Sequence, residues 1–174
     1  RRCNAMPDQL PTVNIGTVAR NANGFGAAAV HIVGRRRWNR RGAMVTERYQ
    51  HVEHHATIDD LVGWAAIGGL PLVGVDNLPG SVPLETTALP RACVLVFGQE
   101  GPGLSAGARD ACSLVCSIAQ FGSTRSINAG AAGAIAIAVG PLIGGLATTY
   151  ASWRWVFAGE VIKRAVSRNR EFLA

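Results

Sequence analysis

A chain of 174 residues and 18.2 kDa is long enough for one domain with an apolar core that needs neither disulfides nor a structural metal. Apolar residues make up 48% of the sequence and charged residues only 16%, which excludes an intrinsically disordered chain. The formal net charge is +6, with 16 arginines against the single Lys163, and this favours a polyanionic partner, although a GC-rich genome produces the same arginine bias.

Short apolar runs alternate with helix-like stretches along the chain, in the rhythm of an α/β domain with a largely parallel sheet. The expected helices are Ile15–Asn23, Thr57–Ile67, Leu104–Ala111 and Ser126–Val139. The expected strands are Ala28–Val33, Leu70–Val75, Cys93–Phe97 and Leu114–Ile118. The strands are mostly apolar, which is typical of central strands that helices cover on both faces.

An arginine-rich loop follows the first expected strand. A basic run with one aromatic side chain offers phosphate contacts and a stacking plane for an unpaired base, so the loop predicts RNA binding. A solvated loop in an arginine-biased proteome is the alternative. The candidate RNA-binding residues are Arg35, Arg36, Arg37, Trp38, Arg40 and Arg41.

The histidines and cysteines do not predict a metal site. His51, His54 and His55 lie with Glu53 on a polar stretch that offers no fourth ligand at a suitable spacing. The cysteines form no CxxC pair and lie in or beside apolar runs, which indicates buried thiols of a reducing compartment. They are Cys3, Cys93, Cys112 and Cys116.

Three short motifs carry the candidate chemistry: Asn14-x-Gly-x-x-x-Arg20, Gly98-x-Glu100-x-x-Gly103 and Gly122-x-x-x-Ser126-x-Asn128. Each lies where a strand or an entering segment meets the start of a helix, which is where an open parallel sheet binds ligands. Taken singly, such glycines are ordinary turn residues, and Ser126 and Asn128 are ordinary helix caps.

Together, in this order and at these separations, the motifs resemble those of the SpoU/TrmH branch of the SPOUT RNA ribose 2'-O-methyltransferases, over residues 12 to 134 or so. The resemblance implies an α/β fold whose parallel sheet is tied in a C-terminal trefoil knot, a rare exception to unknotted topology. It also implies a cytoplasmic enzyme that methylates tRNA or rRNA, with S-adenosyl-L-methionine bound by the knotted loops and an active site shared across a homodimer.

The family's functional positions fall on particular residues of this chain. The implied catalytic residues are Asn14, Arg20, Glu100, Ser126 and Asn128. The implied cofactor-binding residues are Val75, Gly98, Gly103, Ile118 and Ile127. Main-chain groups of glycine-rich loops suit this role because they need close backbone approach rather than particular side chains. The family has Pro-Met where this chain has Ala119-Gln120, which loosens that loop, and Glu100 has a structural alternative as the partner of a neighbouring arginine.

Both ends depart from the family. Residues 1–12 contain Pro7 and Pro11 and do not predict the apolar first strand that should precede Asn14. Residues 126–153 are 28 positions without a charged side chain or histidine, longer than the roughly 18 that raise the expectation of a membrane span. Residues 131–162 resemble a membrane-spanning stretch of major facilitator drug antiporters, in AIAVGPLIGG and TTYASWRWVFAGE.

We therefore expect a methyltransferase core at residues 1–139 and an appended segment, hydrophobic and then basic, at residues 140–174. Methyl transfer from a sulfonium requires no metal, so none is expected. An inactive RNA-binding remnant of such an enzyme is the main alternative function. A membrane-associated fragment governed by residues 126–157 is the least favoured one.

Overall fold

The computed structural model describes residues 13–27, 29–34, 40–99, 101–123, 127–136 and 154–159. Within these ranges the strands form one seven-stranded sheet in the order β2-β1-β7-β5-β3-β6-β4, and each strand pairs with its neighbours in parallel. The strands are β1 (Val30–Val33), β2 (Val52–His55), β3 (Leu72–Val75), β4 (Val82–Pro83), β5 (Ala92–Phe97), β6 (Leu114–Ser117) and β7 (Arg154–Gly159).

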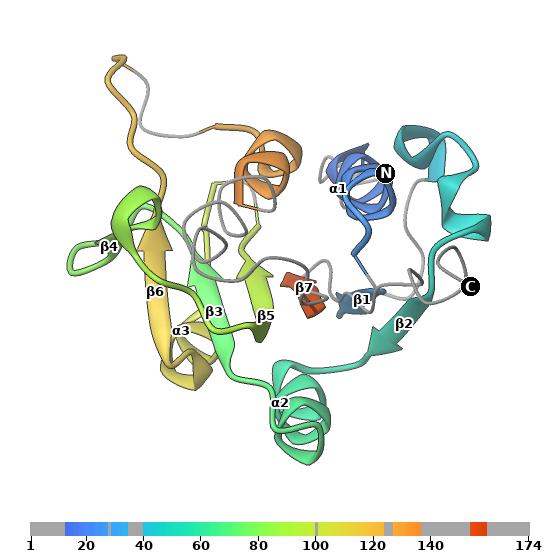
Figure 1. Cartoon of the computed structure of the whole chain (residues 1–174), viewed down its shortest axis with the longest axis horizontal. Helices are drawn as coiled ribbons and strands as arrows, with labels where there is room; N and C mark the ends of the chain where they lie inside the picture. Colours follow the sequence, from blue (N-terminus) through green and yellow to red (C-terminus); the bar gives the residue numbers. More distant parts are fainter. Residues whose placement is uncertain are drawn as a thin grey trace, which may run out of the picture.

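Helices cover both faces of this sheet (Figure 1). They are α1 (Val13–Gly24), α2 (Ile58–Ile67) and α3 (Ala106–Ala111), with a further helical stretch at residues 129–136. Short 3₁₀ turns are η1 (Arg40–Ala43), η2 (Thr46–Arg48) and η3 (Leu84–Thr86). The expected α/β class with a parallel sheet is confirmed, and so are the four expected strands, with ends that shift by up to two residues.

Two apolar cores lie on opposite faces of the sheet because successive strand residues point to opposite sides. One core joins α1 and residues 129–136 to side chains such as Ile32, Leu95 and Phe97. The other joins α2 and α3 to the alternate strand residues, among them Val33, Val94 and Val96. This two-sided burial accounts for the continuous apolar runs that predicted the central strands.

Three strands were missed by the sequence analysis. Strand β2 is VEHH, whose polar side chains hide it, and β4 has only two residues. Strand β7 lies in the middle of the sheet: it pairs with β1 from Val30↔Phe157 to Ile32↔Gly159 and with β5 from Ala92↔Arg154 to Phe97↔Gly159.

The membrane-transporter interpretation of residues 131–162 is not supported. Residues 154–159 form a strand of the sheet and are no part of a membrane-spanning helix. Across the described part of the chain, no helix combines the length and apolar character needed to cross a bilayer. A stretch without charges predicts burial, but it cannot tell burial in lipid from burial in the middle of a sheet. Residues 1–12, 137–153 and 160–174 lie outside the described residues.

Candidate functional site

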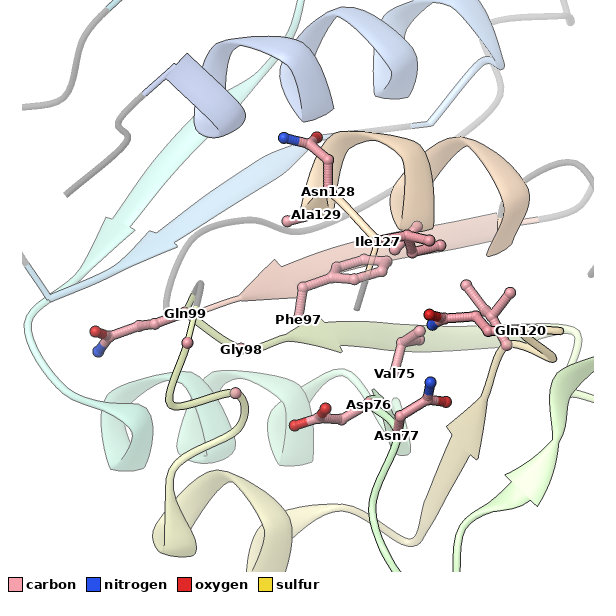
Figure 2. Close-up of a pocket in the computed structure, with 14 residues that line it drawn as sticks. Val75, Asp76, Asn77, Phe97, Gly98, Gln99, Gln120, Ile127, Asn128 and Ala129 are labelled. Carbon is pink, nitrogen blue, oxygen red and sulfur yellow. The ribbon is translucent and has the colours of Figure 1, made fainter. Parts of the chain in front are cut away.

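A pocket of about 460 Å³ lies at the carboxyl ends of β3, β5 and β6. Its walls are the loops that follow these strands and the first turn of the helical stretch at 129–136. Figure 2 shows Val75, Asp76 and Asn77 on one side and Ile127 and Asn128 on the other, with the Phe97 ring between them. The carboxyl edge of a parallel sheet is where such folds bind small molecules, and the volume lies in the usual range of about 300 to 1,000 Å³.

The structure brings all five expected cofactor-binding residues to this pocket: Val75, Gly98, Gly103, Ile118 and Ile127. They come from four separate segments of the chain, and only the fold makes them neighbours. Val75 and Ile118 are buried, while Gly98 and Gly103 contribute backbone. That these residues bind a cofactor remains a prediction.

The loop between β5 and α3 is a tight turn that only glycine permits. Gln99 N–H donates to the Gly103 carbonyl at 3.0 Å, and Gly103 N–H donates to the Gln99 carbonyl at 2.9 Å. A Cβ atom at Gly98 would fall on the backbone of Gly103 and Leu104. Gly103 has a φ of +72°, in the left-handed region, and a Cβ there would fall on the Asp76 carboxylate. These contacts explain the spacing of the two glycines in the motif.

Asp76 fixes this glycine loop to the end of β3. Its Oδ2 atom accepts a hydrogen bond of 2.8 Å from the Leu104 backbone N–H. Asp76 belongs to none of the three motifs, although a carboxylate directly after an apolar strand marks the carboxyl edge of a parallel sheet. Asp76 therefore ties two of the pocket's loops together.

Glu85 has a similar role for the loop after β6. Its Oε1 atom accepts a hydrogen bond of 2.6 Å from the Ala119 N–H, next to the pocket residues Ile118 and Gln120. Ala119-Gln120 was expected to loosen this loop. The hydrogen bond from Ala119 to Glu85, which lies outside the motifs, holds the loop in place. No local pattern links residues 34 positions apart, so sequence reasoning had no signal for this contact.

The expected catalytic residue Asn128 lines the pocket and also caps a helix. Its Oδ1 atom accepts from the Gly130 N–H at 2.8 Å, and its carbonyl accepts from the Ala132 N–H at 2.9 Å. Asn128 is thus confirmed as a helix cap. Because it also lies in the pocket wall, a catalytic role for Asn128 stays a prediction.

Two of the remaining expected catalytic residues lie on α1. Arg20 is exposed on α1, and Asn14 lies in the first turn of the same helix. Helix α1 is fixed beside the pocket because Asn21 Nδ2 donates to the Gly130 carbonyl at 2.8 Å. Glu100 and Ser126 lie outside the described residues.

Most of the arginine-rich loop is also outside the described residues, namely Arg35, Arg36, Arg37 and Trp38. The backbone of Arg40 and Arg41 lies in η1. The end of η1 packs on α1, since a Cβ at Gly16 would fall on the backbone of Gly42 and Ala43. The last arginines of the loop therefore lie on a segment that contacts the helix carrying Arg20.

The described cysteines fit the expectation of buried thiols. Cys93 and Cys116 are buried, and all three described cysteines are free thiols. Burial raises the pKa of Cys93 and Cys112 to about 12 and, with the nearby Glu85 charge, that of Cys116 to about 11. At neutral pH these groups are protonated, and none of them is an activated nucleophile.

Comparison with known proteins relates this chain to proteins described as methyltransferases. A sequence profile of the SpoU rRNA Methylase family matches residues 11–138. Two proteins described as uncharacterized tRNA/rRNA methyltransferases, from Mycobacterium sp. strains KMS and MCS, are each 33% identical to this chain over 132 residues. The aligned region covers 72% of this chain and 41% of each relative, so this chain spans less than half the length of these proteins.

Solved structures share the fold. The AdoMet-bound rRNA methyltransferase of Sinorhizobium meliloti has a TM-score of 0.68 at 24% identity, over 75% of this chain and 52% of that one. The SpoU methyltransferase AviRb of Streptomyces viridochromogenes, in complex with the cofactor AdoMet, has a TM-score of 0.68 at 22% identity, over 74% and 52%. A structure described as an RNA 2'-O ribose methyltransferase has a TM-score of 0.68 at 20% identity, over 76% and 52%.

Proposed function

Because this chain belongs to the SpoU rRNA Methylase family, we propose that it transfers a methyl group from S-adenosylmethionine to a ribose 2'-hydroxyl of tRNA or rRNA. The observation that carries this proposal is the convergence of all five expected cofactor-binding residues on one pocket. The mycobacterial relatives described as tRNA/rRNA methyltransferases support the RNA substrate. The similar fold described as a 2'-O ribose methyltransferase supports the ribose as the methylated group.

The pocket fits such a cofactor in size and in chemistry. Val75, Phe97, Ile118 and Ile127 offer an apolar surface for the adenine ring, and the glycine loop offers main-chain groups at close range. The side-chain amides of Asn77 and Gln120 add polar groups to the pocket wall. Asp76 and Glu85 hold the loops in place, so the pocket is formed before a ligand enters.

When bound, the cofactor supplies an electrophilic methyl group on a sulfonium, which leaves as a neutral thioether. The protein has to align the ribose oxygen with this methyl group and stabilise the negative charge that grows on that oxygen as the hydroxyl proton passes to solvent. We assign the second task to Arg20, because a guanidinium forms paired, charge-assisted hydrogen bonds to phosphate. Arg20 thus binds the phosphate beside the reacting ribose, and Asn14 holds Arg20 or the facing loop.

The position of Arg20 is consistent with an active site shared by two chains. Arg20 is exposed on α1 and does not line the pocket of its own chain. We propose that a second copy brings its Arg20 to this pocket in a homodimer. The trefoil knot, the roles of Glu100 and Ser126, RNA contacts by the arginine-rich loop, and a cytoplasmic location belong to the same proposal.

The first test is calorimetric titration of the full chain with S-adenosylmethionine and with its demethylated product, in buffer without added metal. The proposal predicts saturable binding of both ligands, with one site per chain. A folded chain that binds neither ligand contradicts the proposal. A chain that binds RNA but not the cofactor identifies the inactive RNA-binding remnant instead.

A further inference from the structure

Two histidines and one glutamate converge on the sheet face that α2 covers. Strand β1 pairs with the edge strand β2 in the register His31↔Glu53 and Val33↔His55. Residues two apart on a strand share a face, so His31, Glu53 and His55 lie on one side of this strand pair. Their ligand atoms all lie within 4.8 Å of one another. Sequence reasoning missed His31 because it lies 24 residues from His55 and belongs to another strand.

The donor atoms are spaced almost as the ligands of one metal ion. His31 Nδ1 lies 3.4 Å from Glu53 Oε2. His31 Nδ1 lies 2.5 Å from His55 Nε2, and the ring centroids are 4.8 Å apart with a 7° angle between the planes. The centroid separation equals the nitrogen separation plus a ring radius on each side, so the rings meet edge to edge with these nitrogens facing each other.

A tetrahedral zinc ion with bonds of about 2.0 to 2.1 Å holds neighbouring ligand atoms about 3.3 Å apart. His31 and Glu53 already have this separation. The two imidazoles have to part by less than about 1 Å, and each ring has to tilt by about 35° so that both nitrogen lone pairs meet at the ion. That movement is available because His55 is half-buried and belongs to the edge strand. Without an ion, the two facing nitrogens share a proton.

The surroundings hold the donors in position. His31 is fully buried, and its ring packs edge-on against Trp64 of α2 at 4.5 Å. His51 Nε2 lies 2.9 Å from Glu53 Oε1, so this hydrogen bond orients the carboxylate while Oε2 faces His31. The backbone fixes both ends of the strand pair, through hydrogen bonds from Val30 N–H to the His51 carbonyl and from Gly34 N–H to the His55 carbonyl.

We propose that His31, Glu53 and His55 bind one Zn²⁺ ion. Two imidazoles and one carboxylate are a ligand set that zinc prefers, and the solvent-exposed edge at β2 leaves a fourth position for water. The site lies on the α2 face, whereas Phe97 of the pocket belongs to the core on the opposite face. The ion therefore takes no part in methyl transfer. It joins the edge strand to β1, the two strands between which the arginine-rich loop runs.

The test is calorimetric titration of the full chain, first freed of metal with a chelator, using zinc chloride. Binding of one ion per chain is expected, with proton release and a higher Tm. Cobalt(II) used in place of zinc should give the visible absorption bands of tetrahedral coordination. We expect the chain without zinc to fold and to bind S-adenosylmethionine, because the site and the pocket lie on opposite faces of the sheet, so this test and that of the proposed function fail independently.

The discriminating variants lie on the edge strand, where they disturb folding least. His55→Ala and Glu53→Gln should each weaken zinc binding by about a hundredfold or more, and His51→Ala by about tenfold. The matched control is His54→Ala, since His54 contacts the Gly34 carbonyl and is not one of the three ligands. Unchanged affinity in His55→Ala, an equal loss in His54→Ala, or no ion bound by the unaltered chain overturns the proposal.

Discussion

Gly98 is the residue on which the shape of the pocket most depends, because its neighbours leave no room for a side chain. Replacement of Gly98 by Leu forces the backbone of Gly103 and Leu104 away from the end of β5. We expect S-adenosylmethionine to bind at least about tenfold more weakly to Gly98→Leu, since a loop in the pocket wall moves. Calorimetric titration measures the change.

The matched control is Gly63→Ala, at an exposed position of α2 outside the motifs. A Cβ atom at Gly63 meets nothing within 4 Å, so this variant should bind the cofactor as the unaltered chain does. Equal affinity in Gly98→Leu and the unaltered chain counts against the placement of the cofactor.

Substitution of Arg20 distinguishes an effect on methyl transfer from an effect on cofactor binding. Arg20→Ala should abolish methyl transfer with little change in S-adenosylmethionine affinity, because Arg20 lies outside the pocket wall and is assigned to the ribose and its phosphate. The loss should fall on kcat more than on KM, as for a contact made mainly in the transition state. Arg109→Ala, at an exposed arginine in α3, is the control. Full activity in Arg20→Ala refutes the assignment.

The residues of the pocket could be predicted from sequence to the extent that they belong to motifs. Gly98 and Gly103 were predictable because the turn demands glycine at both places. Asp76 and Glu85 were not, because each acts on a backbone N–H that lies 28 and 34 residues away, respectively. Contacts of this kind depend on which loops the sheet brings together, and a single sequence does not contain that information.

At the scale of elements, α2 has a strong start signal. Thr57 Oγ1 accepts from the Asp60 N–H at 3.2 Å, and Asp60 Oδ2 accepts from the Thr57 N–H at 2.9 Å, which together form a capping box. These hydrogen bonds to Thr57 lower the pKa of Asp60 below its usual value of 3.8. The charged form of Asp60 therefore stabilises the folded chain.

The capping box predicts a pH dependence of stability. The stabilisation by Asp60 is fully present above its unfolded pKa of about 3.8 and is lost as the pH falls through the lower pKa of the folded state. The difference in free energy of unfolding between the unaltered chain and Asp60→Ala should shrink over that window. Urea unfolding at a series of pH values measures it. Asp59 lies in the same turn but outside the capping box, so Asp59→Ala should not show this loss. The same pH dependence of stability in both variants would contradict the role of the capping box.

Strands that are buried on both faces could be predicted from their own sequence. Strands that are defined by their neighbours in the sheet could not. The runs at β3 and β5 are apolar because both faces of these strands are covered. Strand β2 is polar because it is an edge strand with half-exposed side chains, so its sequence resembles a loop. Strand β7 follows a long apolar stretch, and only the open place between β1 and β5 identifies it as a strand.

At the scale of the whole molecule, β7 joins the two halves of the sheet. Residues 140–174 were expected to be an appended segment, but a chain that ends near Val139 lacks the strand between β1 and β5. We now expect it to unfold at a lower temperature and less cooperatively than the full chain, because two buried strands lose their hydrogen-bonding partner. Calorimetric melting compares the two chains, with a chain ending at residue 162 as the control that keeps β7. A sharp transition at an unchanged Tm in the shorter chain would show that β7 is dispensable.

The central proposal is that the pocket and the helix carrying Arg20 serve one reaction, ribose methylation of RNA. The most direct measurement incubates unmodified tRNA and rRNA with the full chain and S-adenosylmethionine labelled in the methyl group, and then identifies the labelled nucleosides by mass spectrometry. We expect a labelled 2'-O-methyl nucleoside, with the label on the ribose fragment, and none with Arg20→Ala. Label on a base, or unlabelled RNA from a chain that is folded and binds the cofactor, would contradict it.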